Sequence, residues 1–219
     1  MPNNPKVYTN EMSHKQASKN LELTVTDPIL DSENIMKFAT VHEVTQWRNF
    51  ILDGMVYDLS HLDAQWVEYL DTRNSENPIT YKFIVTYGLH CFTKEVEGMS
   101  REESQRLMYT APRESRPFNF ERYELSKNLP NIIKSLGNKE TLVCHAGYND
   151  YAVVKVLNSN GCVVDYFVPF AVFRESKKLR LHIKSAYPKY EGLGKIQKVN
   201  FFAIAKNLLH NKKLPQPPK

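Results

Sequence analysis

The sequence predicts an α+β fold, in which an N-terminal helical and mixed region precedes helices packed on an antiparallel β-sheet. Two observations carry this prediction: helix-like segments open the second half of the chain, and four strand-like runs with short turns follow them. The 219 residues are 42% hydrophobic and 11% aromatic, which is enough for a packed core and is not the composition of a disordered chain. We therefore expect one compact unit with an N-terminal extension.

The N-terminal part should combine a helix with short strands. Residues 1–32 are polar, and we expect them to be flexible. Apolar residues recur at roughly helical spacing from Ser32 to Leu52, which predicts a helix that ends before Gly54. Further elements are expected as strands at 55–59, 65–70 and 79–92, and as a helical turn at 101–108. Residues 33–117 would thus form a helix and β-hairpin region packed on the core.

Residues 118–207 are predicted to form the core. Its two helices are expected at 120–129 and 131–136. Asn119 is a suitable N-cap for the first, and Pro130 should break the helix because proline lacks the backbone N–H and clashes with the preceding turn. The second helix should end with Gly137 and Asn138 in the left-handed conformation.

The strands of the core should form an antiparallel sheet. They are expected at 140–145, 151–157, 162–173 and 179–187. The tetrapeptide Asn158-Ser159-Asn160-Gly161 is a strong hairpin signal between the second and third of these strands. A fifth run, 198–205, predicts either an edge strand or the start of a terminal helix. The last residues, 208–219, form a basic, proline-rich tail, and we expect its end, KKLPQPPK at 212–219, to be disordered.

The last predicted strand alternates apolar and cationic residues. Its apolar residues are Leu179, Leu181 and Ile183, and its cationic residues are Arg180, His182 and Lys184. Because side chains alternate between the two faces of a strand, the two sets should lie on opposite faces. Helices can bury only one face of the sheet, so we expect the cationic face to stay open. A solvated edge strand with outward charges would show the same pattern.

Basic charge is concentrated in the C-terminal region. From Arg174 onward, twelve Lys and Arg stand against two Glu, a net of +10, while the whole chain carries +5. The first 173 residues therefore carry a net of −5. This distribution indicates RNA or another polyanion, or an acidic protein partner or inhibitor. The predicted nucleic-acid-binding residues are Arg180, Lys184, Lys189 and Lys195.

Several enzyme classes lack their motifs in this sequence. There is no phosphate-binding glycine loop, HExxH helix or GxSxG elbow, so we expect neither a metal nor a cofactor. Three cysteines without CxxC spacing favour reduced thiols and a cytoplasmic location. No run approaches the roughly 18 apolar residues of a membrane span, and the first residues are polar, so we expect no membrane contact and no secretory signal.

Metal-free RNA cleavage is compatible with the residue types of the last strand. The ribose 2′-hydroxyl is the nucleophile, so the protein supplies a general base, a general acid and cations for the transition state. Histidine suits the proton transfers, and lysine suits the phosphate. The predicted catalytic residues are His182, His145, Lys184 and Ser185. Ser185 has the parity of the apolar face unless a bulge near Ala186 re-aims it.

The helix-then-four-strand order and the ending Lys184-Ser185-Ala186-Tyr187-Pro188 resemble the barnase/EndoU/colicin/RelE group of small RNases and toxins. This resemblance covers residues 118–190 and implies cleavage of RNA. The group often places a base early in its fold, where this chain has Glu121, Glu124 or His145. Separately, the segments YDLSHLD, LHCFTK and FERYELSKNLP are similar to a family of bacterial proteins often borne on mobile elements. That similarity spans residues 55–205 and implies no particular activity.

Two functions are therefore open. The first is an RNA-directed, metal-independent endoribonuclease or toxin-like protein of a bacterial mobile element. The second is a non-catalytic binding protein that uses the open basic face of the sheet for nucleic acid or for an acidic protein partner. Catalysis by the histidines would separate the first function from the second.

Overall fold

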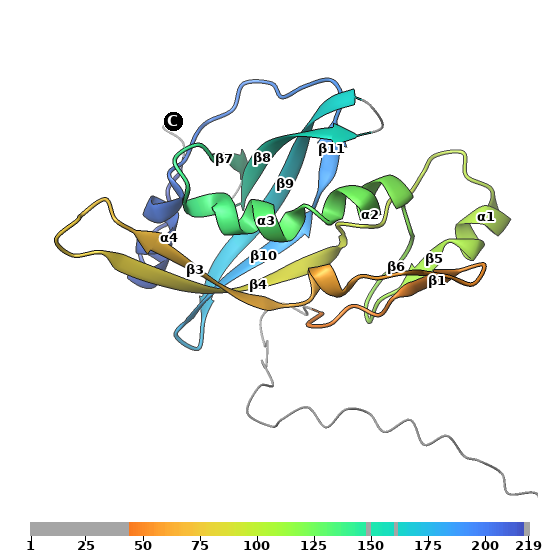
Figure 1. Ribbon diagram of the computed structural model, residues 1–219, viewed down its shortest axis with the longest axis horizontal. Coiled ribbons are helices and arrows are strands. Elements are labelled where there is room, and N and C mark those ends of the chain that lie inside the picture. The colour runs from red at the N-terminus through yellow and green to blue at the C-terminus, as the bar shows by residue number, and fades with distance from the viewer. Residues whose placement is uncertain (1–43, 148–149, 160–161, 217–219) are drawn as a thin grey trace, which may run out of the picture. The chain divides into compact units, whose positions relative to one another are not determined.

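A computed structural model describes residues 44–147, 150–159 and 162–216. The described residues belong to one compact unit, Phe38–Lys219. They form the predicted α+β fold, in which helices pack against a mixed β-sheet (Figure 1). The predicted flexible N-terminus lies outside the described residues.

Seven strands of the described chain form the main sheet, in the order β3-β4-β10-β9-β8-β7, with β11 paired to β9. They are β3 (Gln65–Asp71), β4 (Ile79–His90), β7 (Leu142–Gly147), β8 (Asp150–Ser159), β9 (Cys162–Glu175), β10 (Lys178–Ser185) and β11 (Tyr187–Lys189). Strands β7 to β10 form the predicted antiparallel meander. The hairpin between β8 and β9 is also confirmed, with Ser159 paired to Cys162.

The parallel pairing of β4 with β10 differs from the wholly antiparallel sheet that we expected. It places Leu181 beside Val85 and His182 beside Thr86. The sheet therefore crosses the boundary that the sequence suggested between residues 117 and 118. As a consequence, β10 lies in the interior of the sheet, with β4 on one side and β9 on the other. This interior position determines how far the cationic side chains of β10 are exposed to solvent.

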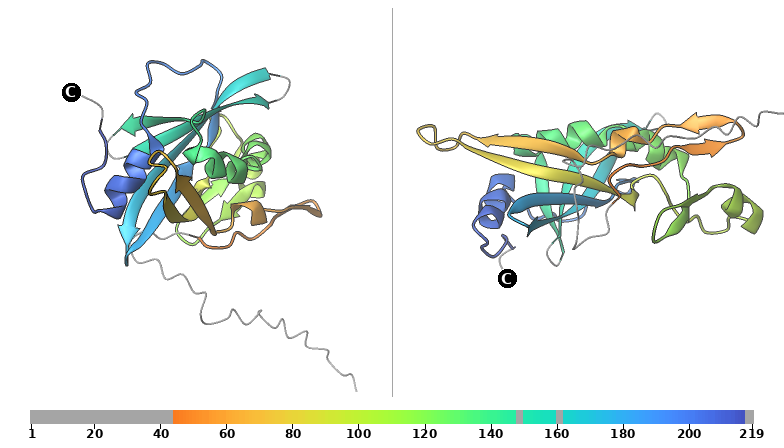
Figure 2. Two further views of the ribbon diagram at one scale, coloured as in Figure 1. Left: turned by 60° about the vertical axis from the view of Figure 1, so that its left-hand side comes forward. Right: turned by 90° about the horizontal axis from the view of Figure 1, so that it is seen from below.

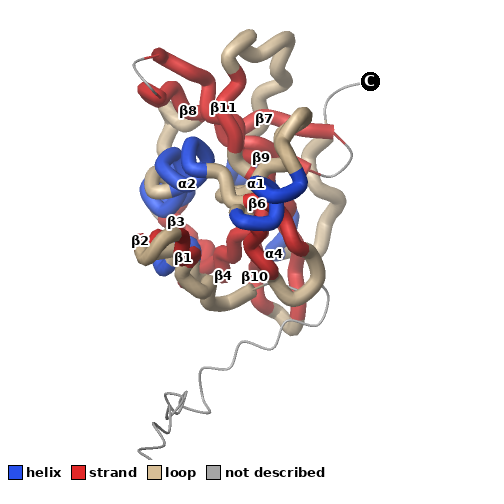
Figure 3. The backbone as a smooth tube through the Cα atoms, turned by 90° about the vertical axis from the view of Figure 1, so that its right-hand side faces the viewer, coloured by secondary structure: helices blue, strands red, loops and turns tan. Residues whose placement is uncertain are grey.

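Three helices of the described chain contribute to the main core, namely α2 (Phe120–Ser126), α3 (Leu129–Lys134) and α4 (Phe201–Leu209). Helices α2 and α3 lie over one face of the sheet, and the sheet curls around this side (Figures 1 and 3). Helix α4 lies at the end of the sheet near the β3–β4 and β9–β10 turns (Figure 2). Fully buried residues from sheet and helices, such as Leu181, Ile133 and Ile204, meet in this core.

The helix boundaries follow the sequence signals in part. The Asn119 side chain accepts a hydrogen bond from the Arg122 backbone N–H at 2.9 Å, as expected of an N-cap. Helix α2 ends before Pro130, which lies in the first turn of α3, where proline is tolerated. The left-handed ending is wrong: Asn138 is extended, with φ −77° and ψ 144°, because a 3₁₀ turn at Ser135–Gly137 leads directly toward β7. The ambiguous fifth run forms α4.

The remaining elements are β1 (Phe50–Leu52), β2 (Met55–Tyr57), a 3₁₀ helix (Ser60–Leu62), α1 (Arg101–Arg106), β5 (Met108–Thr110) and β6 (Ser115–Pro117). The helix expected up to Leu52 is wrong from residue 44 onward; its earlier part lies outside the described residues. Asp53 and Gly54 have φ of 50° and 78°, the geometry of a tight hairpin turn, and this turn pairs β1 with β2. None of the helices in the described ranges has the length and apolarity that crossing a membrane requires.

Candidate functional site

The predicted alternation in β10 correctly separates its two faces. Leu179, Leu181 and Ile183 are at most 4% exposed and belong to the main core. The three residues of opposite parity point to the other face of the sheet. Their surroundings differ from the open cationic surface that we expected.

Arg180 is buried, with only 2% of its surface exposed. Its guanidinium forms an ion pair with Glu175 and lies 4.8 Å from the centre of the Phe173 ring. Both partners come from β9, the neighbouring strand. The expectation of an exposed Arg180 is therefore wrong, and a nucleic acid could reach this charge only by breaking a buried ion pair.

His182 is largely shielded from solvent and makes a hydrogen bond within the sheet. Its Nδ1 lies 3.0 Å from the Thr86 hydroxyl on β4. Burial lowers the pKa of His182 to about 4, and the charges of Arg180 and Lys184 act in the same direction. The imidazole is neutral at pH 7 and is only a weak base, so its protonation behaviour is poorly suited to acid–base catalysis near neutral pH.

Lys184 and Ser185 also have partners inside the protein. The Lys184 ammonium is exposed but lies 2.5 Å from the carboxylate of Asp150. The Ser185 hydroxyl donates a hydrogen bond to the backbone oxygen of His90 at 3.3 Å. The pairing of β10 with β4 shifts register between Ile183 and Ser185, which is the kind of irregularity expected at this end of the strand.

His145 lies on the other face of the sheet from His182. Cross-strand partners form one row: His145, Tyr151, Phe170 and Ile183. Residues paired in this way point to the same face, and Ile183 points into the core. Strands β8 and β9 also separate β7 from β10, a spacing of about 14 Å. The structure therefore does not bring the two predicted catalytic histidines together.

Lys189 and Lys195 complete the predicted set. Lys189 lies on β11, with its ammonium 4.7 Å from the centre of the Phe167 ring. Its pairing with Asp165 places it on the same face of the sheet as Lys184. Lys195 is exposed in the segment between β11 and α4. The binding role of these lysines stays a prediction.

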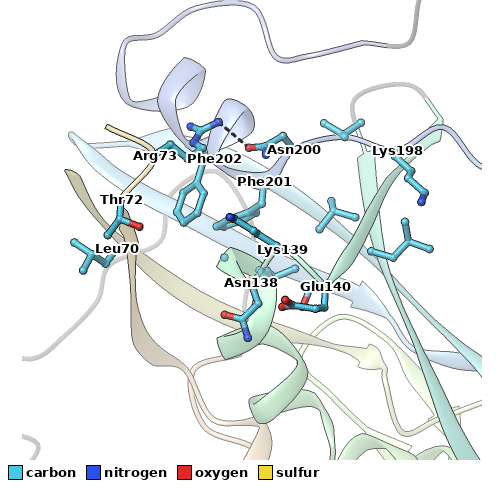
Figure 4. Close-up of a pocket in the computed structure, with 16 residues that line it drawn as sticks. Leu70, Thr72, Arg73, Asn138, Lys139, Glu140, Lys198, Asn200, Phe201 and Phe202 are labelled. Carbon is cyan, nitrogen blue, oxygen red and sulfur yellow. Dashed lines mark hydrogen bonds between the residues drawn. The ribbon is translucent and has the colours of Figure 1, made fainter. Parts of the chain in front are cut away.

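A cavity of about 570 Å³ opens where β3 ends, β7 begins and α4 starts (Figure 4). Its charged lining residues are Arg73, Lys139, Glu140 and Lys198. All four side chains belong to exposed residues, so a ligand could reach them from solvent. Three cations thus face one carboxylate at this first cavity.

A second cavity, of about 630 Å³, shares Arg73 with the first and is bounded by the β3–β4 turn, α4 and the segment that follows α4. Its charged lining residues are Asp71, Arg73, Lys206 and Lys212. Three cations again face one carboxylate. We call the two cavities together the basic groove, and its five cations are Arg73, Lys139, Lys198, Lys206 and Lys212.

Arg73 is held in place between the two cavities. Its Nε and Nη2 donate to the two carboxylate oxygens of Asp71 at 2.8 and 2.7 Å, and these hydrogen bonds lower the pKa of Asp71. Its Nη1 donates to the Asn200 side chain at 3.1 Å, and the guanidinium lies 5.3 Å from the centre of the Phe202 ring. Three contacts therefore fix the guanidinium before any ligand arrives.

The residue pattern did not predict the basic groove. Arg73 stands in the turn after β3, where a single cation carries no local signal. The charge distribution is the one sequence feature that indicates the groove, because Lys198, Lys206 and Lys212 all belong to the basic C-terminal region. The predicted binding residues of that region, however, lie on β10 and in the segment up to Lys195, whereas the cations of the groove lie on α4 and on either side of it.

The two thiols that the structure describes lie in the protein interior. Cys91 and Cys144 are buried and form no disulfide, and burial raises the pKa of Cys91 to about 12, so this thiol stays protonated. The side chain of Cys162 lies outside the described residues. Within the described ranges, no group of three or more His, Cys, Asp or Glu side chains is arranged to hold a metal ion.

Comparison with known proteins assigns a family. The model of the YjaZ family matches residues 49–209 of this chain. Protein YjaZ of Escherichia coli (strain K12) is 51% identical over 179 residues, which cover 81% of this chain and 98% of that protein. No solved structure matches this chain. The matched region includes every strand of the main sheet and all of α4.

Proposed function

The chain belongs to the YjaZ family, and we propose that it binds RNA through the basic groove without cleaving it. The observation that carries the proposal is the convergence of five cations from separate segments on two adjoining cavities. Among the described residues, only two carboxylates, those of Asp71 and Glu140, line the same cavities, and Asp71 is already paired with Arg73. Such an excess of positive charge favours a phosphate backbone.

The polar lining favours RNA over an acidic protein. The groove contains five asparagines: Asn74, Asn77, Asn138, Asn200 and Asn207. Amide side chains both donate and accept hydrogen bonds, as base edges and ribose hydroxyls require. An acidic protein would instead be expected to need a broad contact with apolar anchors. Each cavity also has the volume of a small-molecule site, which suits a nucleotide unit.

The positions of the histidines support RNA binding without RNA cleavage. His145 and His182 lie on opposite faces of the sheet, and neither lines the basic groove. The low pKa of His182 leaves it neutral near pH 7. Cleavage by the predicted histidine pair would need two groups placed on the same scissile phosphate.

The proposal is tested by fluorescence anisotropy with a labelled single-stranded RNA of about 12 nucleotides. We expect binding whose affinity falls steeply with salt, because each phosphate neutralised by a cation releases counterions. Replacement of Lys198 and Lys206 together by alanine should weaken binding about tenfold or more. The matched control replaces Lys189 and Lys195, which lie outside the groove, and should change little.

Three outcomes would contradict RNA binding through the basic groove, and a fourth would contradict the absence of cleavage. Absence of RNA binding at low salt would refute it. Loss of binding only in the Lys189 and Lys195 variant would move the site to the predicted lysine surface. Tighter binding of a poly-glutamate peptide than of RNA would favour an acidic protein partner. Incubation of the same RNA in EDTA, followed by detection of 2′,3′-cyclic phosphate ends, would show cleavage if it occurs.

A further inference from the structure

Tyr81 on β4 lines the second cavity and is only 1% exposed. Its hydroxyl has no hydrogen-bond partner among the described residues. A buried hydroxyl without a partner destabilises a folded protein, so its presence in a cavity wall calls for an explanation. Burial raises the pKa of Tyr81, so the hydroxyl keeps its proton at neutral pH and can donate a hydrogen bond.

The surroundings of this hydroxyl are those of an anion site. A guanidinium has five N–H donors, and Arg73 directs three of them to Asp71 and Asn200, which leaves two for a ligand. The same cavity is lined by Lys206 and Lys212, while Asp71 is its one carboxylate among the described residues. The lining charges give a net of +2, which matches the charge of roughly −1.5 to −2 that a phosphomonoester carries near pH 7.

We propose that the second cavity binds a phosphate group, held by the Tyr81 hydroxyl, the Arg73 guanidinium and the Lys206 ammonium. The inference rests on the proposed function, because the phosphate would be one group of the bound RNA. A phosphate offers oxygen acceptors to all three donors at once. Free phosphate and the 5′-phosphate of an RNA chain present the same chemistry and are distinguished by experiment.

The test compares Tyr81→Phe with Tyr166→Phe in the full-length protein. Both substitutions remove one hydroxyl that is buried and without a partner, and Tyr166 lines neither cavity. Inorganic phosphate, titrated by calorimetry, should bind to the wild type and to Tyr166→Phe with equal affinity. Tyr81→Phe should bind it about tenfold more weakly, as expected for loss of one hydrogen bond to a charged group. Without phosphate, both variants should melt at or slightly above the wild-type temperature.

A second variant keeps the test decisive if Tyr81→Phe does not fold. Lys206→Gln changes an exposed side chain, so the fold should persist, and phosphate affinity should fall about tenfold. The matched control is Lys94→Gln, which changes an exposed lysine that lines neither cavity. Equal phosphate affinity in wild type, Tyr81→Phe and Lys206→Gln would overturn the inference.

RNA probes separate failure of this inference from failure of the proposed function. RNA with a 5′-phosphate should bind more tightly than the same RNA with a 5′-hydroxyl, and Tyr81→Phe should remove the difference. RNA binding by the wild type, together with equal phosphate affinity in wild type and Tyr81→Phe, would overturn the phosphate site and leave the proposed function standing. Phosphate binding that depends on Tyr81, in a protein that does not bind RNA at low salt, would support the site as one for free phosphate and would refute the proposed function.

Discussion

Strand β10 and the basic groove contain the same kinds of cation in opposite surroundings. The side chain of Arg180 on β10 is 2% exposed, whereas that of Arg73 in the groove is 46% exposed, although each pairs with a carboxylate. β10 has a strand on both sides, and Arg180 meets its partner Glu175 on the adjacent strand β9. The groove lies where β3 ends and α4 begins, and the ends of elements leave side chains open to solvent. A run of cations therefore does not by itself mark a binding surface.

The largest effect should come from the apolar face of β10. Leu181→Asp would place a charge in the core, where the residue is fully buried, and should unfold the protein at 25 °C. Circular dichroism and thermal melting measure this outcome. Lys178→Asp, at the exposed start of the same strand, is the control and should melt close to the wild type. Equal melting of both variants would mean that the faces of β10 are misassigned.

The next largest effect on stability should come from Arg180, whose loss should destabilise the protein more than the loss of Arg73. Arg180→Ala should lower the free energy of unfolding by about 3 kcal/mol, because it removes an ion pair with Glu175 at a site where the arginine side chain is only 2% exposed. Chemical denaturation gives the value. A loss below about 0.5 kcal/mol, the range of an ordinary surface substitution, would show that Arg180 is exposed in solution.

His182 should make stability depend on pH. Its pKa is about 4 in the folded protein against an ordinary value of 6.5, so the unfolded chain binds more protons between these values. Stability contributed by the neutral imidazole is complete above pH 6.5 and is lost as the pH falls toward 4. At pH 5 the loss should be about 2 kcal/mol relative to pH 7.

Denaturation curves of His182→Asn across this pH range isolate the contribution of the histidine. Asparagine can keep a hydrogen bond to Thr86 and does not titrate, so its profile should be flatter than that of the wild type. Parallel profiles for the two proteins would show that His182 titrates normally when folded.

The smallest effect on stability should come from the groove. Arg73→Ala should cost about 1 kcal/mol, because its guanidinium is half exposed and its ion pair is screened by water. The same change should weaken RNA binding about tenfold, measured by anisotropy, since Arg73 lies in the wall of both cavities. A variant that loses stability and keeps full RNA affinity would make Arg73 a structural residue, equivalent to Arg180.

Local signals in the sequence determined much of the secondary structure. Asn119 predicted the start of α2 because its side chain caps a helix without help from distant residues. The turn 158–161 predicted the β8–β9 hairpin, and the alternation in β10 predicted which of its side chains point into the core. The sequence predicts a helix end at Gly54, where the structure has a hairpin turn at Asp53-Gly54, because short apolar runs fit helix and strand alike.

Only the tertiary structure determined which strand faces are exposed to solvent and which charged side chains are paired. The parallel pairing of β4 with β10 joins segments about a hundred residues apart, and no local pattern encodes such a contact. That pairing makes β10 an interior strand and, with Glu175 from β9, leaves Arg180 buried. The basic groove likewise requires Arg73 and α4 to meet across the fold. Alternation and capping act within a few residues, whereas exposure and charge pairing depend on which distant segments pack together.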